Sequence, residues 1–371
     1  VSVGETRAAQ TLLQRLLEHY PAHHLLLTGM TPTGRATAAQ VFAALGPANA
    51  ERLHYAYLPY DYPWAIRRFL HHFRPQLGML METELWPNLL AGAAAAGLPV
   101  VLVNARLSAR SARGYRRLAA LARPALESLA AIAAQTNADA GRLEALGARR
   151  ITVCGNLKFD IQPAAESQAL GRQWRSHLAP RPVWLAASTR EGEEALILEA
   201  YSALRQPNLL LLLVPRHPQR FDEVAALVVA RGLSCQRRSQ GLPGAEVQVW
   251  LGDSMGEMAA YYACADLALI GGSLLPFGGQ NLIEAAACGC PVLVGPHTFN
   301  FAQAADDAVA EGAALRLGGA AELADAVAAL LADQTKRRTM QGAALRFAAA
   351  HRGATERTLR LVEELIATAE R

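Results

Sequence analysis

The chain has 371 residues, of which 52% are hydrophobic and 18% charged, and its formal net charge is +4 at neutral pH. This composition excludes an extended disordered chain, and so small a charge does not indicate nucleic-acid binding. No apolar run approaches the roughly 20 residues needed to cross a bilayer. Since one domain usually holds about 100–200 residues, we expect two domains.

Short apolar runs alternate with longer amphipathic segments through the first part of the chain. This alternation predicts βαβ units and a parallel sheet. The apolar runs are nearly continuous, which favours helices on both faces of the sheet. The expected strands are 24–28, 53–58, 77–81, 100–103 and 131–134, and the expected helices are 6–19, 65–72, 85–95 and 138–146.

The chain begins Val-Ser-Val-Gly-Glu, which we interpret as a strand end turning into a helix at Gly4-Glu5. Because it lacks an initiator Met, we expect a fragment without its native N-terminus. A helix N-terminus favours the ionised form of a carboxylate, and such a carboxylate in a cleft can take a proton from a hydroxyl group. Glu5 is therefore a candidate general base, with simple helix capping as the alternative.

Two more polar motifs follow strands of the first part. Glu82 and Glu84 come after an apolar strand and before Trp-Pro, and in extended chain they share one side. Acids there are costly to bury without partners, although they could simply be helix-start acids. Lys158 stands in Gly-Asn-Leu-Lys-Phe-Asp (155–160), in a chain whose basic residues are otherwise almost all arginine. A compact ammonium can neutralise a carboxylate or phosphate; an ordinary surface lysine is the alternative.

A basic segment lies between these motifs, on a helix expected to begin near Ser108. Its arginines could meet an anionic partner or form a solvated helix face. They are Arg106, Arg110, Arg113, Arg116 and Arg117.

The alternation of strands and helices stops at a proline-containing stretch and then restarts. We expect a first domain over 1–160, a linker over 161–182, a second domain over 183–353 and a charged amphipathic helix over 354–371 that packs back on the first domain. The expected strands of the second domain are 183–187, 209–214, 247–251, 267–270 and 292–294.

The motifs of the second domain suit a phosphate ligand. Arg216 follows a buried strand and Pro215, and its planar guanidinium matches phosphate oxygens. Gly252–Met258 leads from a strand through glycine into a helix start. Gly271-Gly272-Ser273 and Gly278-Gly279 precede Asn281, which opens a helix whose positive end suits a phosphate. Glu284, one turn later, can reach ribose hydroxyls; a purely structural turn is the alternative.

The five cysteines have neither zinc-binding nor disulfide spacing, so we expect small buried side chains in a reducing compartment. No carboxylate cluster has the spacing of metal ligands. We therefore expect neither a metal nor another cofactor.

Six motifs, in order, resemble those of the 3-deoxy-D-manno-octulosonic acid (Kdo) transferases of lipid A assembly. They are Ser-Val-Gly-Glu (2–5), Met-Glu-Thr-Glu-Leu-Trp-Pro-Asn (81–88), Asn-Ala-Arg-Leu-Ser (104–108), Gly-Asn-Leu-Lys-Phe-Asp (155–160), Val-Pro-Arg-His-Pro (214–218) and Gly-Pro-His-Thr-Phe-Asn (295–300). The resemblance spans essentially the whole chain. It implies a GT-B fold, in which two doubly wound, Rossmann-like α/β domains face a cleft.

The resemblance also implies the reaction. The donor would be CMP-Kdo and the acceptor a lipid A precursor such as lipid IVA, with inversion at the anomeric carbon and no essential metal. The enzyme would act on the cytoplasmic face of the inner membrane. By motif match Glu5 is the general base, and Glu82 and Lys158 assist at the transition state. The CMP site comprises Pro215, Arg216, Met255, Gly256, Glu257, Asn281, Leu282, Ile283 and Glu284.

Two departures from the family and three competing interpretations remain at this point. We expect the family's N-terminal membrane anchor to be missing from this chain, and Gln280 stands where the family often has His. A GT-B enzyme with a UDP-sugar donor would share the glycine-rich loop and Glu284 but not the first-domain motifs. A dehydrogenase would need an early Gly-x-Gly-x-x-Gly, which the sequence lacks. A non-catalytic nucleotide-binding module would not need acids at positions 5 and 82.

Overall fold

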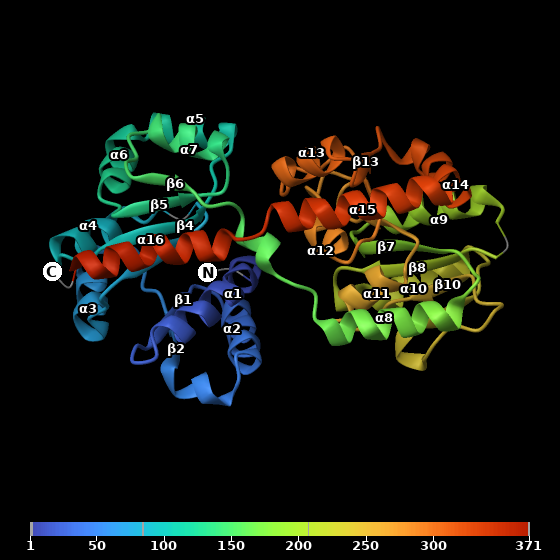
Figure 1. The fold of residues 1–371 in the computed structure, drawn as a ribbon, viewed down its shortest axis with the longest axis horizontal. Helices are drawn as coiled ribbons and strands as arrows, with labels where there is room; N and C mark the ends of the chain where they lie inside the picture. Colours follow the sequence, from blue (N-terminus) through green and yellow to red (C-terminus); the bar gives the residue numbers. More distant parts are fainter. Residues whose placement is uncertain (1–2, 84, 207, 370–371) are drawn as a thin grey trace. The chain divides into compact units, whose positions relative to one another are not determined.

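The structure, a computed structural model, describes residues 3–83, 85–206 and 208–369. The chain divides into two compact units (Figure 1). Unit 1 comprises Val1–Ile161 and His351–Arg371, and unit 2 comprises Gln162–Ala350. The fold of each unit is described separately below.

Unit 1 is built on parallel strands. Strand β1 (Leu25–Gly29) pairs with β2 (Leu53–Tyr57), and a second sheet has the order β3-β4-β5-β6. This second sheet comprises β3 (Gly78–Met81), β4 (Val100–Ala105), β5 (Ala131–Ala134) and β6 (Ile151–Val153). Every residue of β4 and β5 is buried, as expected for strands covered on both faces.

The helices of unit 1 fall between these strands as the alternation predicts. They are α1 (Val3–His19), α2 (Pro32–Ala44), α3 (Pro63–Phe73), α4 (Pro87–Ala95), α5 (Ala109–Arg117), α6 (Ala119–Glu127) and α7 (Asn137–Glu144), with the 3₁₀ turns η1 (Pro47–Arg52) and η2 (Leu157–Asp160). The turn from strand to helix expected at Gly4-Glu5 is wrong, because α1 already includes Val3. The strand end expected there falls largely on residues 1–2, outside the described part of the chain.

The last helix, α16 (Ala354–Ala369), packs against α1, η2 and β5 (Figure 1). Its apolar face supplies Leu359 and Val362, which are almost completely buried together with Leu12 of α1 and Leu157 of η2. Asp160 fixes the start of α16, since its carboxylate accepts hydrogen bonds from the main-chain N–H groups of Gly353 and Thr355. Residues distant in sequence thus complete the core of unit 1.

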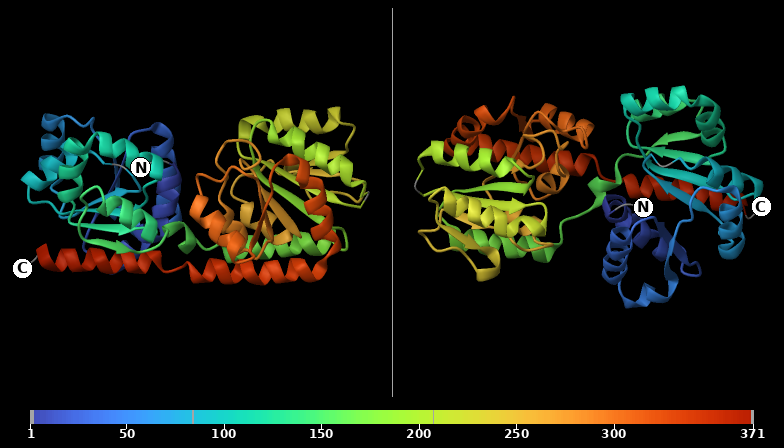
Figure 2. Two further views of the ribbon diagram at one scale, coloured as in Figure 1. Left: turned by 90° about the horizontal axis from the view of Figure 1, so that it is seen from above. Right: turned by 180° about the vertical axis from the view of Figure 1, so that it is seen from behind.

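Unit 2 contains a seven-stranded parallel sheet with the order β13-β12-β11-β7-β8-β10-β9, and helices cover both of its faces (Figures 1 and 2). The strands are β7 (Val183–Thr189), β8 (Leu210–Pro215), β9 (Cys235–Arg237), β10 (Val249–Leu251), β11 (Leu267–Ile270), β12 (Val292–Val294) and β13 (Ala314–Arg316). Strand order reverses between β7 and β11. Ligands of such sheets bind beyond the carboxyl ends of strands at this switch point.

The helical elements of unit 2 connect these strands. They are α8 (Ala165–Leu178), α9 (Glu193–Leu204), η3 (Pro218–Arg220), α10 (Phe221–Ala230), η4 (Arg238–Gln240), α11 (Met258–Cys264), α12 (Leu282–Ala287), α13 (Ala302–Ala310), η5 (Ala320–Glu322), α14 (Leu323–Ala332) and α15 (Gln334–Ala350).

The linker expected at 161–182 is mostly helix α8, which packs closely on α11. A Cβ on Gly171 would lie 2.3 Å from the carbonyl oxygen of Ala260, so glycine permits this approach. Trp174 is buried beside Trp250 and Tyr261, and Arg175 pairs with Asp266 at 3.0 Å. Flanking prolines suggested a linker, but these contacts make the segment part of unit 2.

None of the described helices combines the length and hydropathy required to span a membrane.

Candidate functional site

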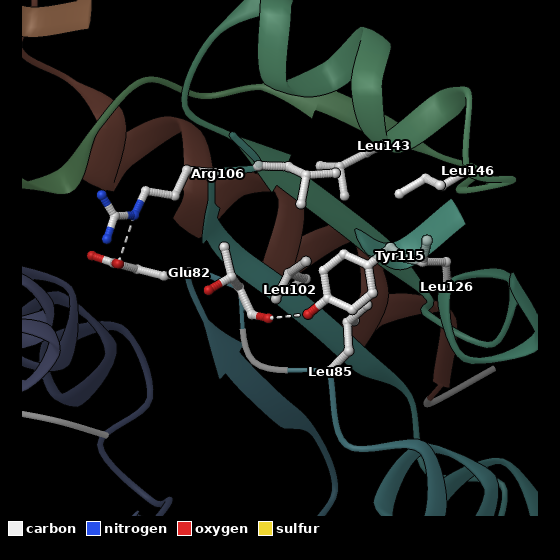
Figure 3. A pocket seen from close by; sticks show the side chains of 10 residues that line it. Glu82, Leu85, Leu102, Arg106, Tyr115, Leu126, Leu143 and Leu146 are labelled. Carbon is white, nitrogen blue, oxygen red and sulfur yellow. Dashed lines mark hydrogen bonds and ion pairs between the residues drawn. The ribbon is translucent and has the colours of Figure 1, made fainter. Parts of the chain in front are cut away.

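Three charged side chains from separate elements of unit 1 converge at the carboxyl end of β3. Figure 3 shows the ion pair between Glu82 and Arg106. The Glu82 carboxylate lies 2.9 Å from Arg106 Nε and 3.4 Å from Lys158 Nζ. Its side chain is only 8% exposed. Glu82 follows β3, Arg106 follows β4 and Lys158 lies in η2. The cluster, called the Glu82 cluster below, joins one carboxylate to two cations.

The backbone is specialised where β3 and β4 end. Glu82 and Asn104 are not glycines, yet their φ angles are 56° and 53°. Such conformations cost about 1–3 kcal/mol and persist where the surroundings enforce them. The Glu82 N–H donates to the carbonyl of Val103 at 3.0 Å, which extends the pairing of the two strands beyond the regular ladder. The positive φ of Glu82, held by this hydrogen bond, therefore sets the direction in which the chain leaves the sheet.

Asn104 fixes the position of η2. Its side chain is 1% exposed, and its Oδ1 accepts the Leu157 N–H at 3.0 Å. Asn156 Oδ1 accepts the Lys158 N–H at 3.0 Å and caps the same turn. The Nδ2 of Asn104 has no hydrogen-bond partner among the described residues. Lys158 is thus carried on a turn that is bonded to the end of β4.

Asp139 holds the main chain next to Arg106. Its Oδ1 accepts the Leu107 N–H at 2.8 Å, and its Oδ2 accepts the Thr136 hydroxyl at 2.6 Å. Arg142 donates to the Leu107 carbonyl at 3.0 Å. The main chain next to Arg106 is therefore held from both its N–H and its carbonyl sides.

A narrow apolar pocket adjoins the Glu82 cluster (Figure 3). Its walls include Leu85, Leu102 and Tyr115, whose hydroxyl donates to the Thr83 carbonyl at 3.2 Å. Burial raises the pKa of the Tyr115 phenol above its ordinary value. Apolar neighbours of this kind limit water near Glu82 and so strengthen its ion pairs. Glu84 lies outside the described residues, so its expected place beside Glu82 remains a prediction.

Glu5 lies in the first turn of α1, and the residue is 9% exposed. Helix α1 packs against η2, the turn that carries Lys158. Glu5 thus lies near the positive end of a helix. Glu5 therefore has the low exposure and the position at a helix start that we expected of a candidate general base.

In unit 2, arginines gather where β7 and β8 end. The Arg216 N–H donates to the Thr189 carbonyl at 2.9 Å, which ties the two strand ends together. Burial, and then the positive charges of Arg190, Arg216 and Arg220, lower the pKa of His217. This local positive potential is suited to a phosphate. Pro215 is the last residue of β8 and is buried.

The glycine-rich loop after β11 is held by a buried carboxylate that we did not predict. The Glu193 side chain is 0% exposed. Its carboxylate accepts hydrogen bonds from the main-chain N–H groups of Gly272 at 2.6 Å, Leu274 at 3.0 Å and Arg190 at 2.9 Å. A Cβ on Gly271 would lie 2.4 Å from the Ser188 carbonyl oxygen, so only glycine fits there. The loops on both sides of the switch point are therefore joined by one side chain.

The helix start after this loop has the predicted form. Asn281 caps α12, because its Oδ1 accepts the Ile283 N–H at 3.1 Å. Leu282 and Ile283 are each 1% exposed, so a ligand could reach only their main chain. Glu284 is half-buried and is not without a partner.

The loop before α11 presents Met255, which is 58% exposed, followed by Gly256 with a φ of 85°. Glu257 does not offer a free carboxylate, since it accepts from Arg238 at 2.9 Å and from the Ser254 hydroxyl. It therefore shapes this loop. A ligand could meet the exposed Met255 side chain and the neighbouring main chain.

Sequence reasoning missed Arg106 as a partner of Glu82, as well as Asn104 and Glu193. Asn-Ala-Arg-Leu-Ser directly after a buried strand was an available signal for Arg106 and Asn104. Glu193 and Glu194, both 0% exposed, follow β7 but resemble ordinary helix-start acids in sequence. In the described part of the chain, no group of three His, Cys, Asp or Glu side chains is placed to bind a metal ion.

Comparisons of sequence identify related proteins. The family model described as 3-deoxy-D-manno-octulosonic-acid transferase (kdotransferase) matches residues 1–161, and that of glycosyl transferases group 1 matches residues 191–346. A 3-deoxy-D-manno-octulosonic acid transferase of Bordetella pertussis is 50% identical, over 98% of this chain and 86% of its own length. The corresponding transferase of Haemophilus influenzae is 40% identical, over 98% and 85% respectively.

Solved structures of lower identity share the fold. A glycosyltransferase from Rickettsia africae has a TM-score of 0.64 at 13% identity, over 100% of this chain and 96% of its own. A UDP-GlcNAc 2-epimerase from Neisseria meningitidis has a TM-score of 0.65 at 15% identity, over 98% of both chains. The predicted α/β fold of the GT-B type is confirmed.

Proposed function

Since the chain belongs to the 3-deoxy-D-manno-octulosonic acid (Kdo) transferase family, we propose that it transfers Kdo from CMP-Kdo to a lipid A precursor such as lipid IVA, with inversion. It is a glycosyltransferase of the GT-B type. The observation that carries the donor and acceptor is the 50% identity to a Kdo transferase over 98% of the chain. The proposed place of action is the cytoplasmic face of the inner membrane, where a lipid acceptor is available.

In the proposed reaction, Glu5 is the general base. It takes the proton of an acceptor hydroxyl while that oxygen bonds to the anomeric carbon of Kdo. The bond between this carbon and the phosphate oxygen breaks at the same time, and CMP leaves with the electron pair. Attack from the face opposite the leaving group inverts the anomeric configuration. The low exposure of Glu5 in the first turn of α1 supports this role.

The Glu82 cluster would stabilise the negative charge of the donor in the transition state. Both oxygens of Glu82 are close to cations, so its own part is to hold Arg106 and Lys158 in fixed positions. Preorganised charges of this kind stabilise a transition state without reorganising during the reaction. The two cations of the cluster would favour an anionic donor or the departing phosphate. We therefore assign the electrostatic assistance to Lys158 and Arg106, with Glu82 as their anchor.

Unit 2 would hold the CMP part of the donor. Arg216, among the arginines around His217, suits the phosphate. The capped start of α12 and the loop held by Glu193 border the switch point of the sheet, where ligands of such folds bind. Glu284 would accept hydrogen bonds from the ribose hydroxyls, and Met255 would pack against the nucleotide.

Glu284→Ala is expected to weaken CMP binding by about 10–100-fold, because hydrogen bonds to a charged group contribute about 1.5–3 kcal/mol. Calorimetric titration of the intact chain with CMP measures this loss. Glu199→Ala is the matched control, since Glu199 is an exposed acid of α9 in the same unit. An unchanged CMP affinity in Glu284→Ala would refute the ribose role.

The arginines of α5 are proposed to meet the phosphates of the acceptor or of the membrane. Ser108 caps the helix, and Arg110, Arg113, Arg116 and Arg117 are all exposed. Within the described residues none of these four forms a salt bridge. Each charge near an anionic membrane contributes on the order of 1 kcal/mol, and salt screens it within a Debye length.

The triple variant Arg113→Gln, Arg116→Gln, Arg117→Gln should therefore raise the apparent KM for the lipid by about tenfold or more, with the KM for CMP-Kdo unchanged. Lys336→Gln, Arg338→Gln, Arg346→Gln removes as many exposed charges from α15 and is the control. Equal lipid KM values in both variants, at low and high salt, would exclude the role.

The direct test of the function is incubation with CMP-Kdo and lipid IVA, followed by mass spectrometry of the lipid. A mass increase of Kdo on the lipid is the expected result. Protection of the chain against heat by CMP but not by UDP would accompany it, since a bound ligand stabilises the folded state. Transfer from a UDP-sugar in place of CMP-Kdo would refute the proposal.

A further inference from the structure

Arg190 carries a positive charge that no step of the proposed reaction uses. It directly follows β7, which ends at Thr189, and it therefore lies at the switch point of the unit 2 sheet. Among the residues that the structure describes, no carboxylate pairs with its guanidinium group. Arg220 differs, because it pairs with Glu194 at 2.7 Å and with Glu223 at 3.0 Å. Arg190 thus offers its charge where ligands of such sheets bind.

The backbone is irregular just before Arg190. Ser188 is not glycine, yet its φ is 56°, and the register of β7 against β8 shifts between Ala187 and Thr189. Irregularities of this kind re-aim the side chains that follow them and are common next to active sites. Residues held in left-handed backbone conformations also cluster at ligand sites. The end of β7 therefore has the form expected of a strand that presents Arg190 to a ligand.

The Arg190 side chain is held in place by unit 2 itself. Its Cζ lies 4.7 Å from the centre of the Phe277 ring, a distance at which a cation and an aromatic face attract each other. Its Cγ would lie 3.5 Å from a Cβ on Gly272, whose φ is 70°. Glu193 accepts hydrogen bonds from the main-chain N–H groups of Arg190 at 2.9 Å and Gly272 at 2.6 Å. Arg190 and the glycine-rich loop are therefore fixed to each other, which lowers the ordering cost of binding.

Arg190 and Arg216 leave neighbouring strand ends. Arg216 follows β8, and its N–H donates to the Thr189 carbonyl at 2.9 Å. Besides burial, the charge of Arg190 and then that of Arg216 lower the pKa of His217, so both charges lie near one residue. Since neighbouring strands are about 4.8 Å apart, the two guanidinium groups can meet two anionic groups of a single ligand.

CMP-Kdo has two such groups. Its phosphate is joined to the anomeric carbon through one oxygen, and the carboxylate of the sugar acid is bonded directly to the same carbon. We infer that Arg190 binds this carboxylate, while Arg216 binds the phosphate. A planar guanidinium matches a carboxylate with two parallel hydrogen bonds. A donor with a neutral sugar would leave Arg190 without this partner, so Arg190 selects an acidic sugar. The inference rests on the proposed function for the identity of the donor.

Calorimetric titration of the intact chain, without acceptor, compares CMP with freshly prepared CMP-Kdo. Arg190→Gln should bind CMP-Kdo about 10–100-fold more weakly than the parent does, because a hydrogen-bonded charge is lost. Its affinity for CMP should be unchanged, since CMP has no carboxylate. Arg190→Lys keeps the charge but lacks the planar fork, and should show a smaller loss for CMP-Kdo. Arg231→Gln, at an exposed arginine after α10, is the control and should bind both ligands as the parent does.

The affinity for CMP separates the possible roles of Arg190. Equal weakening of CMP and CMP-Kdo in Arg190→Gln would assign Arg190 to the phosphate and overturn the inference, as would an unchanged affinity for CMP-Kdo. Should Arg190→Gln fail to fold, parental affinity of Arg190→Lys for CMP-Kdo would overturn it. Binding of CMP-Kdo that depends on Arg190 as expected, in a chain that transfers no Kdo to lipid IVA, would count against the proposed function alone.

Discussion

Glu5→Gln is expected to lower turnover by about 10²–10⁴-fold, the usual contribution of a general base. Glutamine keeps the size and hydrogen-bonding atoms of the side chain but cannot accept the proton of the acceptor hydroxyl. The residue is 9% exposed in the first turn of α1, so the substitution alters little else on the surface. Turnover with CMP-Kdo and lipid IVA measures the effect, and calorimetry with CMP should show unchanged donor binding.

The control for Glu5 lies on the same helix. Glu18→Gln removes a carboxylate from the last turn of α1, where it pairs with Arg15 at 2.6 Å and is largely exposed. It should have nearly parental turnover. Loss of the acid from the first turn should cost only about 0.3–1 kcal/mol of stability through the helix dipole, so the melting temperature separates a catalytic loss from unfolding. Near-normal turnover of Glu5→Gln would remove Glu5 from the mechanism.

Lys158→Ala is expected to lower turnover by about 10²–10³-fold, the scale of removing one preorganised charge from a reacting centre. The variant removes one of the two cations that pair with Glu82. The effect should be on turnover rather than on the affinity for CMP, which we assign to unit 2. Single-turnover kinetics with CMP-Kdo and lipid IVA measure the chemical step.

Lys158→Arg distinguishes charge from shape. Arginine keeps the charge, but its planar group is larger than the ammonium that lies 3.4 Å from Glu82, and the lysine side chain is only 17% exposed. We expect intermediate activity. Lys336→Arg, at the exposed lysine of α15, is the control. Full activity of Lys158→Arg would mean that any nearby positive charge suffices.

The sequence predicted local structure best where one pattern decides it. Continuous apolar runs located β5, β11 and β12 to the residue, because strands covered on both faces need little else. A helix start near Ser108 was also predicted, and in the structure the Ser108 side chain caps α5. Helix α8 was missed because its prolines lie outside the helix, while its packing partner α11 is distant in sequence.

The candidate site was predicted residue by residue but not as an arrangement. Glu82 and Lys158 could be proposed from their motifs. Their meeting with Arg106 depends on β3 pairing with β4, on the positive φ of Glu82, and on the bond from Asn104 to η2. None of these can be derived from the spacing of residues. Glu193 was missed for the same reason, because it accepts hydrogen bonds from main-chain N–H groups that are distant in sequence.

The division of the chain into its two units has a consequence for the order of synthesis. Unit 1 consists of two segments of the chain, Val1–Ile161 and His351–Arg371, and the whole of unit 2 lies between them in sequence. Its buried contacts of Leu12 and Leu157 with Leu359 and Val362 can form only after all of unit 2 has been translated. During that interval the apolar side of α1 lacks its packing partners in α16, while unit 2 can already fold. The segment from His351 onward thus completes a unit whose other residues were translated before unit 2.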